Sequence, residues 1–139
     1  MMRNASIGFL LTVVLAFSGM LYAQEEEPHV FIIVTWESLN PEDGSNAEFD
    51  SLRAIWTENA INKNEFIVNE IRMTHLYGSN SSDYVVITEH KSFADIEKAA
   101  NRNDELFREF MPDDKEREEY FDAIFKYFGN HSDEIYQGF

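Results

Sequence analysis

The sequence has no cysteine in its 139 residues. This absence excludes disulfide bonds, thiolate nucleophiles and zinc sites with cysteine ligands. It also excludes a lipid anchor of the bacterial lipoprotein kind, because that anchor needs a cysteine at the cleavage point. The fold must therefore be stabilised by apolar burial, for which the 14% of aromatic residues, mostly Phe, supply the side chains.

Basic residues are also scarce: 11 Lys and Arg stand against 26 Asp and Glu, so the net charge is −15. A surface this acidic repels phosphate backbones and anionic lipid headgroups. We therefore expect no nucleic acid and no membrane surface as a partner. The hydrophobic content of 44% is too high for a disordered chain.

The N-terminal segment differs from the rest of the chain. It has one Arg, an apolar stretch from Ile7 to Ala16, and then small and neutral residues before a Leu-Tyr-Ala that ends at Ala23. This order predicts a signal peptide over residues 1–23 and an exported protein, periplasmic or secreted. An uncleaved membrane anchor is the alternative, since Ile7 to Ala23 spans 17 residues, the short limit for a membrane helix. We expect a flexible tail at 24–28 and one domain at 29–139.

The expected order of elements in this domain is strand, helix, two strands, two helices and strand. Apolar and β-branched runs predict strands over 29–37, 65–78, 83–91 and 133–137. Apolar residues at three- and four-residue spacing predict helices over 47–62, 93–110 and 113–129.

Five residues mark the ends of these helices. Ser45 with Glu48 forms a capping box for the first helix, and Ser92 is expected to cap the second. Pro112 ends the second helix, and Gly129 fits the C-terminal stop of the third.

The two middle strands predict a hairpin, because only the polar turn SNSS (79–82) separates them. If Gly78 faces Asp83, then Arg72 lies opposite Glu89 and Glu70 lies opposite Lys91. Both pairs join opposite charges on one face of the hairpin. The other face then collects Ile71, Met73, His75, Tyr77, Tyr84, Val86, Thr88 and His90.

This order of elements is that of the ferredoxin-like split βαβ arrangement, an α+β fold with a four-stranded antiparallel sheet and helices on one face. The second face of the sheet stays bare and is rich in apolar residues. A bare apolar face is usually an interface, so we expect a homodimer in which two such faces pack together.

The segments HVFIIVTWE, MTHLYG…DYVVITEH and KSFADIEKA give the chain from Val30 to Tyr136 a resemblance to the dimeric α/β-barrel superfamily. The resemblance implies a ligand position in the cleft between the bare sheet face and the helices or the partner subunit. Members of this superfamily include cofactor-free monooxygenases, haem-degrading and haem-binding proteins, and many proteins without a known activity.

The candidate site residues are Trp36, His75, Tyr77 and His90. His75 and Tyr77 are two residues apart on a predicted strand and so share a face, where His75 is a candidate base and Tyr77 a candidate hydrogen-bond donor. Trp36 could form an aromatic wall beside them, and His90 lies on the same face in the predicted register. The alternative is that these side chains only pack in a dimer interface.

We expect no cofactor and no metal. In the predicted register His75 and His90 lie about 13 Å apart, too far to share one metal ion. A single His could be an axial haem ligand, but no motif supports haem. The acids at Glu42, Asp43 and Asp50 lack the calcium-loop pattern.

Three functions remain open from the sequence. The leading hypothesis is an exported homodimer that binds a small apolar or aromatic ligand in a cleft on the open sheet face, near Trp36, His75 and Tyr77. The second is a cofactor-independent oxygenase or isomerase with His75 as its base. The third is a structural or interaction protein without a ligand.

Overall fold

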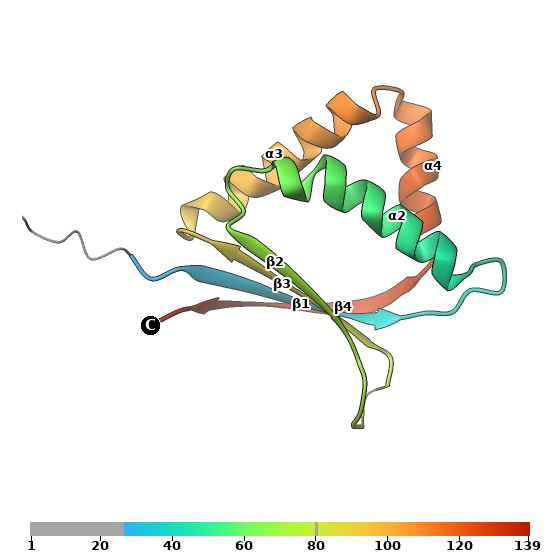
Figure 1. The fold of residues 1–139 in the computed structure, drawn as a ribbon, viewed down its shortest axis with the longest axis horizontal. Coiled ribbons are helices and arrows are strands. Elements are labelled where there is room, and N and C mark those ends of the chain that lie inside the picture. Colours follow the sequence, from blue (N-terminus) through green and yellow to red (C-terminus); the bar gives the residue numbers. More distant parts are fainter. Residues whose placement is uncertain (1–26, 80) are drawn as a thin grey trace, which may run out of the picture.

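The computed structural model describes residues 27–79 and 81–139, and the expected signal peptide lies outside them. Four strands form one antiparallel sheet in the order β2-β3-β1-β4, and three helices lie on one side of it (Figure 1). The elements are β1 (Val30–Ser38), α2 (Asn46–Asn59), η1 (Ile61–Lys63), β2 (Asn69–Thr74), β3 (Asp83–His90), α3 (Ala94–Phe110), α4 (Asp114–Phe125) and β4 (Phe128–Gln137). The predicted ferredoxin-like α+β fold is confirmed.

The helix starts follow the sequence signals at α2 but not at α3. The hydroxyl of Ser45 accepts a hydrogen bond from the backbone N–H of Glu48 at 3.2 Å, as predicted, but the Ser45 N–H donates to the Tyr127 hydroxyl at 2.8 Å instead of completing the capping box. The expected Ser92 cap is wrong, because that hydroxyl donates to the Asp95 carboxylate at 2.8 Å and α3 begins without a side-chain cap. Pro112 lies between α3 and α4, as predicted.

The last strand is longer than predicted, and the last helix is shorter. β4 begins at Phe128, so Gly129 is a strand residue and the expectation of a helix stop there is wrong. A Cβ atom at Gly129 would lie 2.5 Å from a carboxylate oxygen of Glu37 on β1. The missing side chain therefore leaves room for the Glu37 side chain on the neighbouring strand.

The predicted hairpin register is also wrong. Arg72 lies opposite Val86 and Glu70 lies opposite Thr88, so neither of the predicted cross-strand ion pairs forms. β2 ends at Thr74 and β3 begins at Asp83, so the loop between them is longer than the predicted SNSS turn. Because the shift is an odd number of residues and side chains alternate between faces, it exchanges the two faces of β3.

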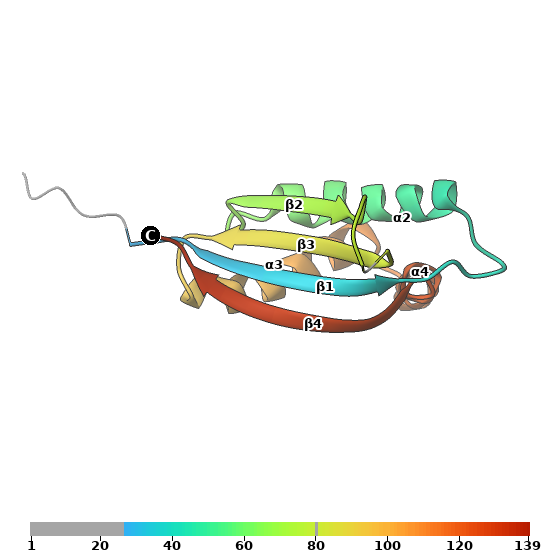
Figure 2. The same cartoon turned by 90° about the horizontal axis from the view of Figure 1, so that it is seen from below.

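The face of the sheet that packs on the helices is identified by Tyr84, whose ring lies 5.8 Å from that of Phe49 on α2. Strand pairing and alternation place Trp36, Arg72 and Val86 on this same helix face. The opposite face, here called the open face, is not covered by any described helix, as Figure 2 shows. Its apolar residues are Phe31, Ile33, Ile71, Met73, Val85, Ile87 and Tyr136.

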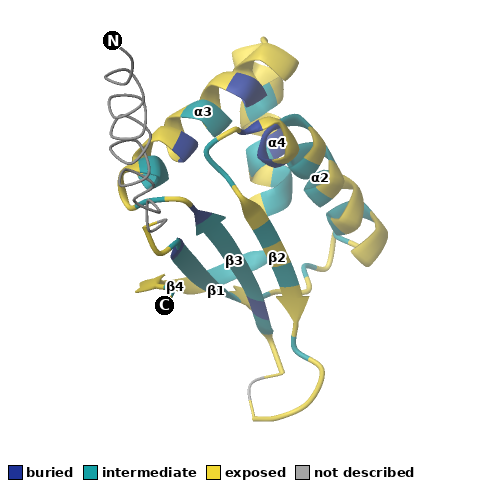
Figure 3. Cartoon of the chain, turned by 60° about the vertical axis from the view of Figure 1, so that its left-hand side comes forward, coloured by how far each residue is buried: buried dark blue, intermediate teal, exposed yellow. Residues whose placement is uncertain are grey.

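An aromatic cluster joins the three helices. Phe107 on α3 is only 1% exposed, and its ring centroid lies 5.1 Å from Trp56, 4.8 Å from Tyr120 and 5.4 Å from Phe121. Figure 3 shows buried residues on the helices, whereas the loop between β2 and β3 is mostly exposed. One part of the core therefore lies between α2, α3 and α4, and the buried residues Val30, Tyr84 and Tyr127 extend the core to the sheet and to its junction with α4.

Candidate functional site

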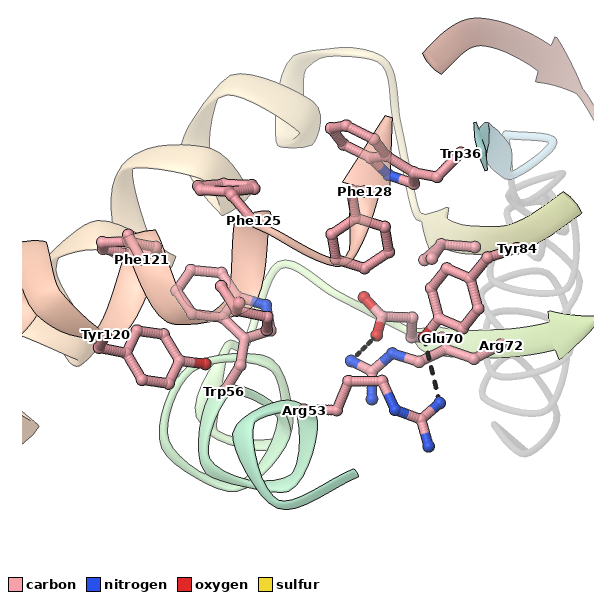
Figure 4. Close-up of a pocket in the computed structure, with 12 residues that line it drawn as sticks. Trp36, Arg53, Trp56, Glu70, Arg72, Tyr84, Tyr120, Phe121, Phe125 and Phe128 are labelled. Atoms are coloured by element: carbon pink, nitrogen blue, oxygen red, sulfur yellow. Dashed lines mark hydrogen bonds and ion pairs between the residues drawn. The ribbon is translucent and has the colours of Figure 1, made fainter. Parts of the chain in front are cut away.

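A cavity of about 270 Å³ lies between the helix face of the sheet and helices α2 and α4 (Figure 4). This volume is close to the lower limit of small-molecule sites. The lining side chains come from every strand and from both helices: Trp36, Arg53, Trp56, Glu70, Arg72, Tyr84, Val86, Tyr120, Phe121, Ile124, Phe125 and Phe128.

Aromatic rings form most of the cavity wall. The Trp36 ring, on β1, lies 5.1 Å from Phe128 and 6.5 Å from Phe125. Phe121 and Phe125 stack one helical turn apart on α4, with their centroids 5.9 Å apart, and Phe121 lies 6.0 Å from Trp56 on α2. The three-and-four spacing that predicted the buried sides of these helices therefore also supplies the wall of the cavity.

One ion pair lies within this apolar wall. Glu70 and Arg72 are two residues apart on β2, so both side chains extend from the helix face, and Arg72 donates hydrogen bonds to Glu70 and to Thr57 on α2. The Glu70 side chain is 9% exposed and that of Arg72 is 20% exposed. Burial raises the pKa of Glu70, and the attraction of Arg72 opposes that rise only in part.

A second cation, Arg53 on α2, lies against Tyr84. Its guanidinium donates to the Tyr84 hydroxyl at 3.2 Å and to the Asp50 carboxylate at 2.8 Å. The same group lies over the ring of Phe49, 5.3 Å from the centroid. These contacts fix the Tyr84 hydroxyl at the cavity wall, where Tyr84 is only 3% exposed.

Tyr120 is the remaining titratable group of the cavity wall. Its hydroxyl donates to the backbone carbonyl of Leu52 at 2.9 Å. Burial raises the pKa of Tyr120 to about 12. Tyr120 therefore stays protonated at neutral pH and is bonded to the backbone of α2.

The four predicted site residues do not come together. Trp36 lines the cavity, whereas His75 and Tyr77 do not. His75 follows the end of β2, and the Tyr77 side chain is 97% exposed in the loop beyond it. His90 was expected on the face that carries Ile71, but it lies on the helix face, 2% exposed, with Nδ1 2.9 Å from the backbone oxygen of Phe66.

The other two histidines also have local partners. His29 Nδ1 lies 2.5 Å from a carboxylate oxygen of Glu89, and the ring of His131 lies 4.1 Å from that of Trp36. Among the residues that the structure describes, no group of three or more His, Asp or Glu side chains is arranged to hold a metal ion. No helix in this described part of the chain is long and apolar enough to cross a membrane.

The sequence interpretation missed four polar residues of the cavity: Arg53, Glu70, Arg72 and Tyr84. The first three had a signal in the sequence. Arg53 lies four residues after Phe49 and three before Trp56, so a cation interrupts the apolar stripe of α2. Glu70 and Arg72 flank Ile71 in an otherwise apolar run, and alternation places both charges on one face whatever the register.

No family model matches the chain, and the comparison with curated proteins finds no match. Similar solved structures exist. A variant of SnoaB, a cofactor-independent oxygenase from Streptomyces nogalater, is 14% identical, with a TM-score of 0.51 over 78% of this chain and 91% of that one. A conserved protein from Methanosarcina mazei Go1 is 15% identical, with a TM-score of 0.53 over 82% of this chain and 96% of that one.

A dimeric ferredoxin-like protein from an uncultured marine organism is also similar. It is 9% identical, with a TM-score of 0.52 over 82% of this chain and 90% of that one. At such low identities the likeness shows the fold alone. The chain therefore shares the ferredoxin-like α+β fold of these proteins, in agreement with a loose resemblance to the dimeric α/β-barrel superfamily.

Proposed function

We propose that this protein binds a small apolar or aromatic molecule in the cavity between the sheet and helices α2 and α4. The observation that carries the proposal is the wall itself, where aromatic rings surround a few fixed polar groups. Binding sites for small molecules are typically apolar with a few oriented polar groups. A volume of about 270 Å³ suits a ligand with a single ring or with two fused rings.

The same proposal includes a homodimer formed through the open face. Ile71 and Met73 are 46% and 43% exposed in the protomer, and Tyr136 is 49% exposed. A second copy would remove this apolar surface from water, and a similar solved structure is described as dimeric.

The dimer is tested by sedimentation of two matched variants. Ile71→Glu places a charge on the open face, whereas Leu39→Glu places one on a residue after β1 that is 38% exposed. We expect the unchanged protein and Leu39→Glu to sediment as dimers at micromolar concentration and Ile71→Glu as a monomer. An unchanged protein that is monomeric would refute the homodimer.

Export through a signal peptide cleaved after Ala23 is the third part of the proposal. It is supported by the order of charged, apolar and small residues before that position. Expression of the full chain in a bacterium, followed by fractionation and intact mass measurement, tests it. A mature species that begins at Gln24 outside the cytoplasm is expected, and a full-length species held in the membrane would support the anchor instead.

The ligand site is tested by the fluorescence of Trp36 and Trp56, the two tryptophans of the chain, which both line the cavity. The titrant is 2-tetralone, a bicyclic aromatic ketone. Val86→Phe enlarges a side chain in the cavity wall, and Val85→Phe makes the same change at the neighbouring residue on the open face. These two variants distinguish the cavity from a site on the open face.

We expect the unchanged protein and Val85→Phe to bind 2-tetralone equally well and Val86→Phe to lose at least tenfold in affinity, about 1.4 kcal/mol. If Val85→Phe weakens binding and Val86→Phe does not, the ligand lies on the open face. If the unchanged protein gives no saturable change at millimolar titrant, the proposed site is wrong.

An enzyme is the second candidate function, either an oxygenase without a cofactor or an isomerase. Two observations favour it: a carboxylate and a tyrosine hydroxyl both line the cavity, and SnoaB, which is described as a cofactor-independent oxygenase, has a similar fold. His75 remains an untested prediction as the base, but it does not line this cavity.

A further inference from the structure

The two oxygens of the Glu70 carboxylate have unequal partners. Within the described part of the chain, Oε1 accepts the hydrogen bond from Arg72, whereas Oε2 has only the hydroxyl of Thr88, at 3.5 Å, the outer limit of a hydrogen bond. Figure 4 shows this carboxylate extending from β2 into the space that the aromatic rings surround. A buried carboxylate oxygen with so little compensation can readily accept a proton.

The Tyr84 hydroxyl is the complementary group. It accepts a hydrogen bond from Arg53 at 3.2 Å, and the bonds among residues 27–79 and 81–139 include no acceptor for its own proton. A hydroxyl that accepts from a guanidinium becomes a stronger donor, because hydrogen bonds in a chain polarise one another. Tyr84 therefore has a proton that it can donate to an oxygen of a ligand in the cavity.

We propose that the cavity removes a proton from the carbon next to the carbonyl group of a small aromatic ketone, with Glu70 as the proton acceptor and Tyr84 as the donor to the developing enolate oxygen. The inference rests on the proposed ligand site and adds a reaction and two catalytic residues to it. Arg72 holds the carboxylate in place, and Arg53 holds the Tyr84 hydroxyl; these two are positioning residues.

The step needs no oxidant and no cofactor. The C–H bond next to the carbonyl breaks, its proton forms an O–H bond with Oε2 of Glu70, and its electron pair forms the C=C bond. The π electrons of the carbonyl move to the oxygen, which the Tyr84 hydroxyl stabilises. Return of a proton to the same or another carbon completes an exchange or an isomerisation.

The proton on Glu70 also has a route to solvent. Glu70 and Arg72 line a surface depression between α2 and β2 as well as the cavity, so the ion pair forms the wall between the two spaces. A proton that arrives from the ligand can leave by the outer side. Exchange with solvent is therefore a direct readout of the step.

Proton NMR in D₂O follows the exchange of one pair of 2-tetralone protons, those on the carbon that lies between the aromatic ring and the carbonyl group. Tryptophan fluorescence measures binding separately. Glu70→Gln keeps the shape of the side chain and removes the base. Tyr84→Phe removes only the hydroxyl. Glu118→Gln, on the exposed side of α4, removes the same charge as the first variant and is the control.

We expect the unchanged protein and Glu118→Gln to accelerate exchange equally above buffer. Glu70→Gln should lose about 100-fold or more of the acceleration, and Tyr84→Phe about 100-fold, each with an affinity for 2-tetralone changed less than threefold. If Glu70→Gln proves too unstable to measure, Tyr84→Phe and the pH profile of the unchanged protein decide the matter.

The exchange rate should fall as the pH falls through the pKa of Glu70, because only the ionised carboxylate accepts the proton. That pKa is raised above its ordinary value by burial, so the fall should begin at a higher pH than for an exposed Glu. The charged, titratable and hydroxyl groups that face Glu70, or that line the cavity or one of the two surface depressions beside it, are Asp50, Arg53, Thr57, Glu58, Arg72, Tyr84, Thr88 and Tyr120.

Two results separate this inference from the proposed ligand site. If 2-tetralone binds to the unchanged protein and its protons exchange no faster than in buffer, or if Glu70→Gln keeps full acceleration, the inference is overturned and the ligand site stands. If 2-tetralone does not bind at millimolar concentration, the ligand site and the inference both fall.

Discussion

The ion pair of Glu70 and Arg72 should be energetically coupled, and a double-mutant cycle measures that coupling. The perturbations are Glu70→Gln, Arg72→Met and both together. The side chains are 9% and 20% exposed, so both charges are largely removed from water. Removing one partner of a buried pair typically costs about 3–5 kcal/mol, because the other charge stays buried without compensation.

The two single variants should lower the free energy of unfolding by different amounts. Glu70→Gln should cost about 3 kcal/mol, the lower end of that range, because glutamine still accepts a hydrogen bond from Arg72. Arg72→Met leaves the Glu70 carboxylate without its main partner and should cost about 4 kcal/mol at neutral pH. The double variant leaves no buried charge, so its free energy of unfolding should lie within about 1 kcal/mol of the unchanged protein.

The pH dependence of Arg72→Met has a definite sign. Burial raises the pKa of Glu70 above 4.5, and loss of Arg72 removes the attraction that opposes this rise. The folded variant then binds a proton at pH values where the unfolded chain does not, so its stability increases as the pH falls from 7 toward 4.5. The double variant has no carboxylate at this position and should not show that increase.

Urea unfolding of the four proteins, followed by circular dichroism at several protein concentrations to separate dimerisation from folding, gives the coupling energy. We expect a coupling of about 6 kcal/mol at pH 7, because the single variants cost about 3 and about 4 kcal/mol whereas the double variant stays within about 1 kcal/mol of the unchanged protein. If the costs of the two single variants simply add in the double variant, the two charges do not interact, and the buried pair is refuted.

Three other variants test separate parts of the fold. Phe107→Ala removes the ring at the centre of the helix cluster and should lower the free energy of unfolding by about 3–5 kcal/mol, measured by urea unfolding; a loss below 1 kcal/mol would contradict that burial. The Tyr127 hydroxyl donates to the Glu48 carboxylate at 2.5 Å, and this hydrogen bond lowers the pKa of Glu48. Tyr127→Phe removes the bond, so an NMR titration should find the pKa of Glu48 closer to 4.5, and an unchanged pKa would count against the bond. Gly78→Ala places a side chain at φ 136° in the β2–β3 loop and should cost about 1–3 kcal/mol by the same unfolding assay, and a neutral result would show that the loop adopts another conformation.

Local signals in the sequence were enough to predict the fold. Ser45 marks the start of α2, Pro112 separates α3 from α4, and the apolar spacing identifies the buried sides of the helices. The order of the elements then leaves few topologies, since both long connections contain helices. These features depend on nearby residues, which a single sequence shows directly.

The candidate site could not be predicted in the same way, because it depends on the register of one hairpin. The predicted pairing of Arg72 with Glu89 satisfied both charges across the strands, but Arg72 instead pairs with Glu70 on its own strand. Because Arg72 is already paired with Glu70 on β2, it does not need Glu89 as a partner, and its charge gives no preference for the predicted register. The apolar His75-Leu76-Tyr77 segment resembled a strand although it belongs to the loop, and this error moved Tyr84 to the wrong face.

The central position of β1 in the sheet has a consequence for folding of the growing chain. This strand is synthesised first, but its two neighbours, β3 and β4, lie at 83–90 and 128–137. This apolar strand is therefore made long before its partner β4 (Phe128–Gln137), and pairings between such distant segments form slowly. A chain truncated before Phe128 would leave one edge of β1 open to strands of other molecules, which predicts aggregation of the truncated product.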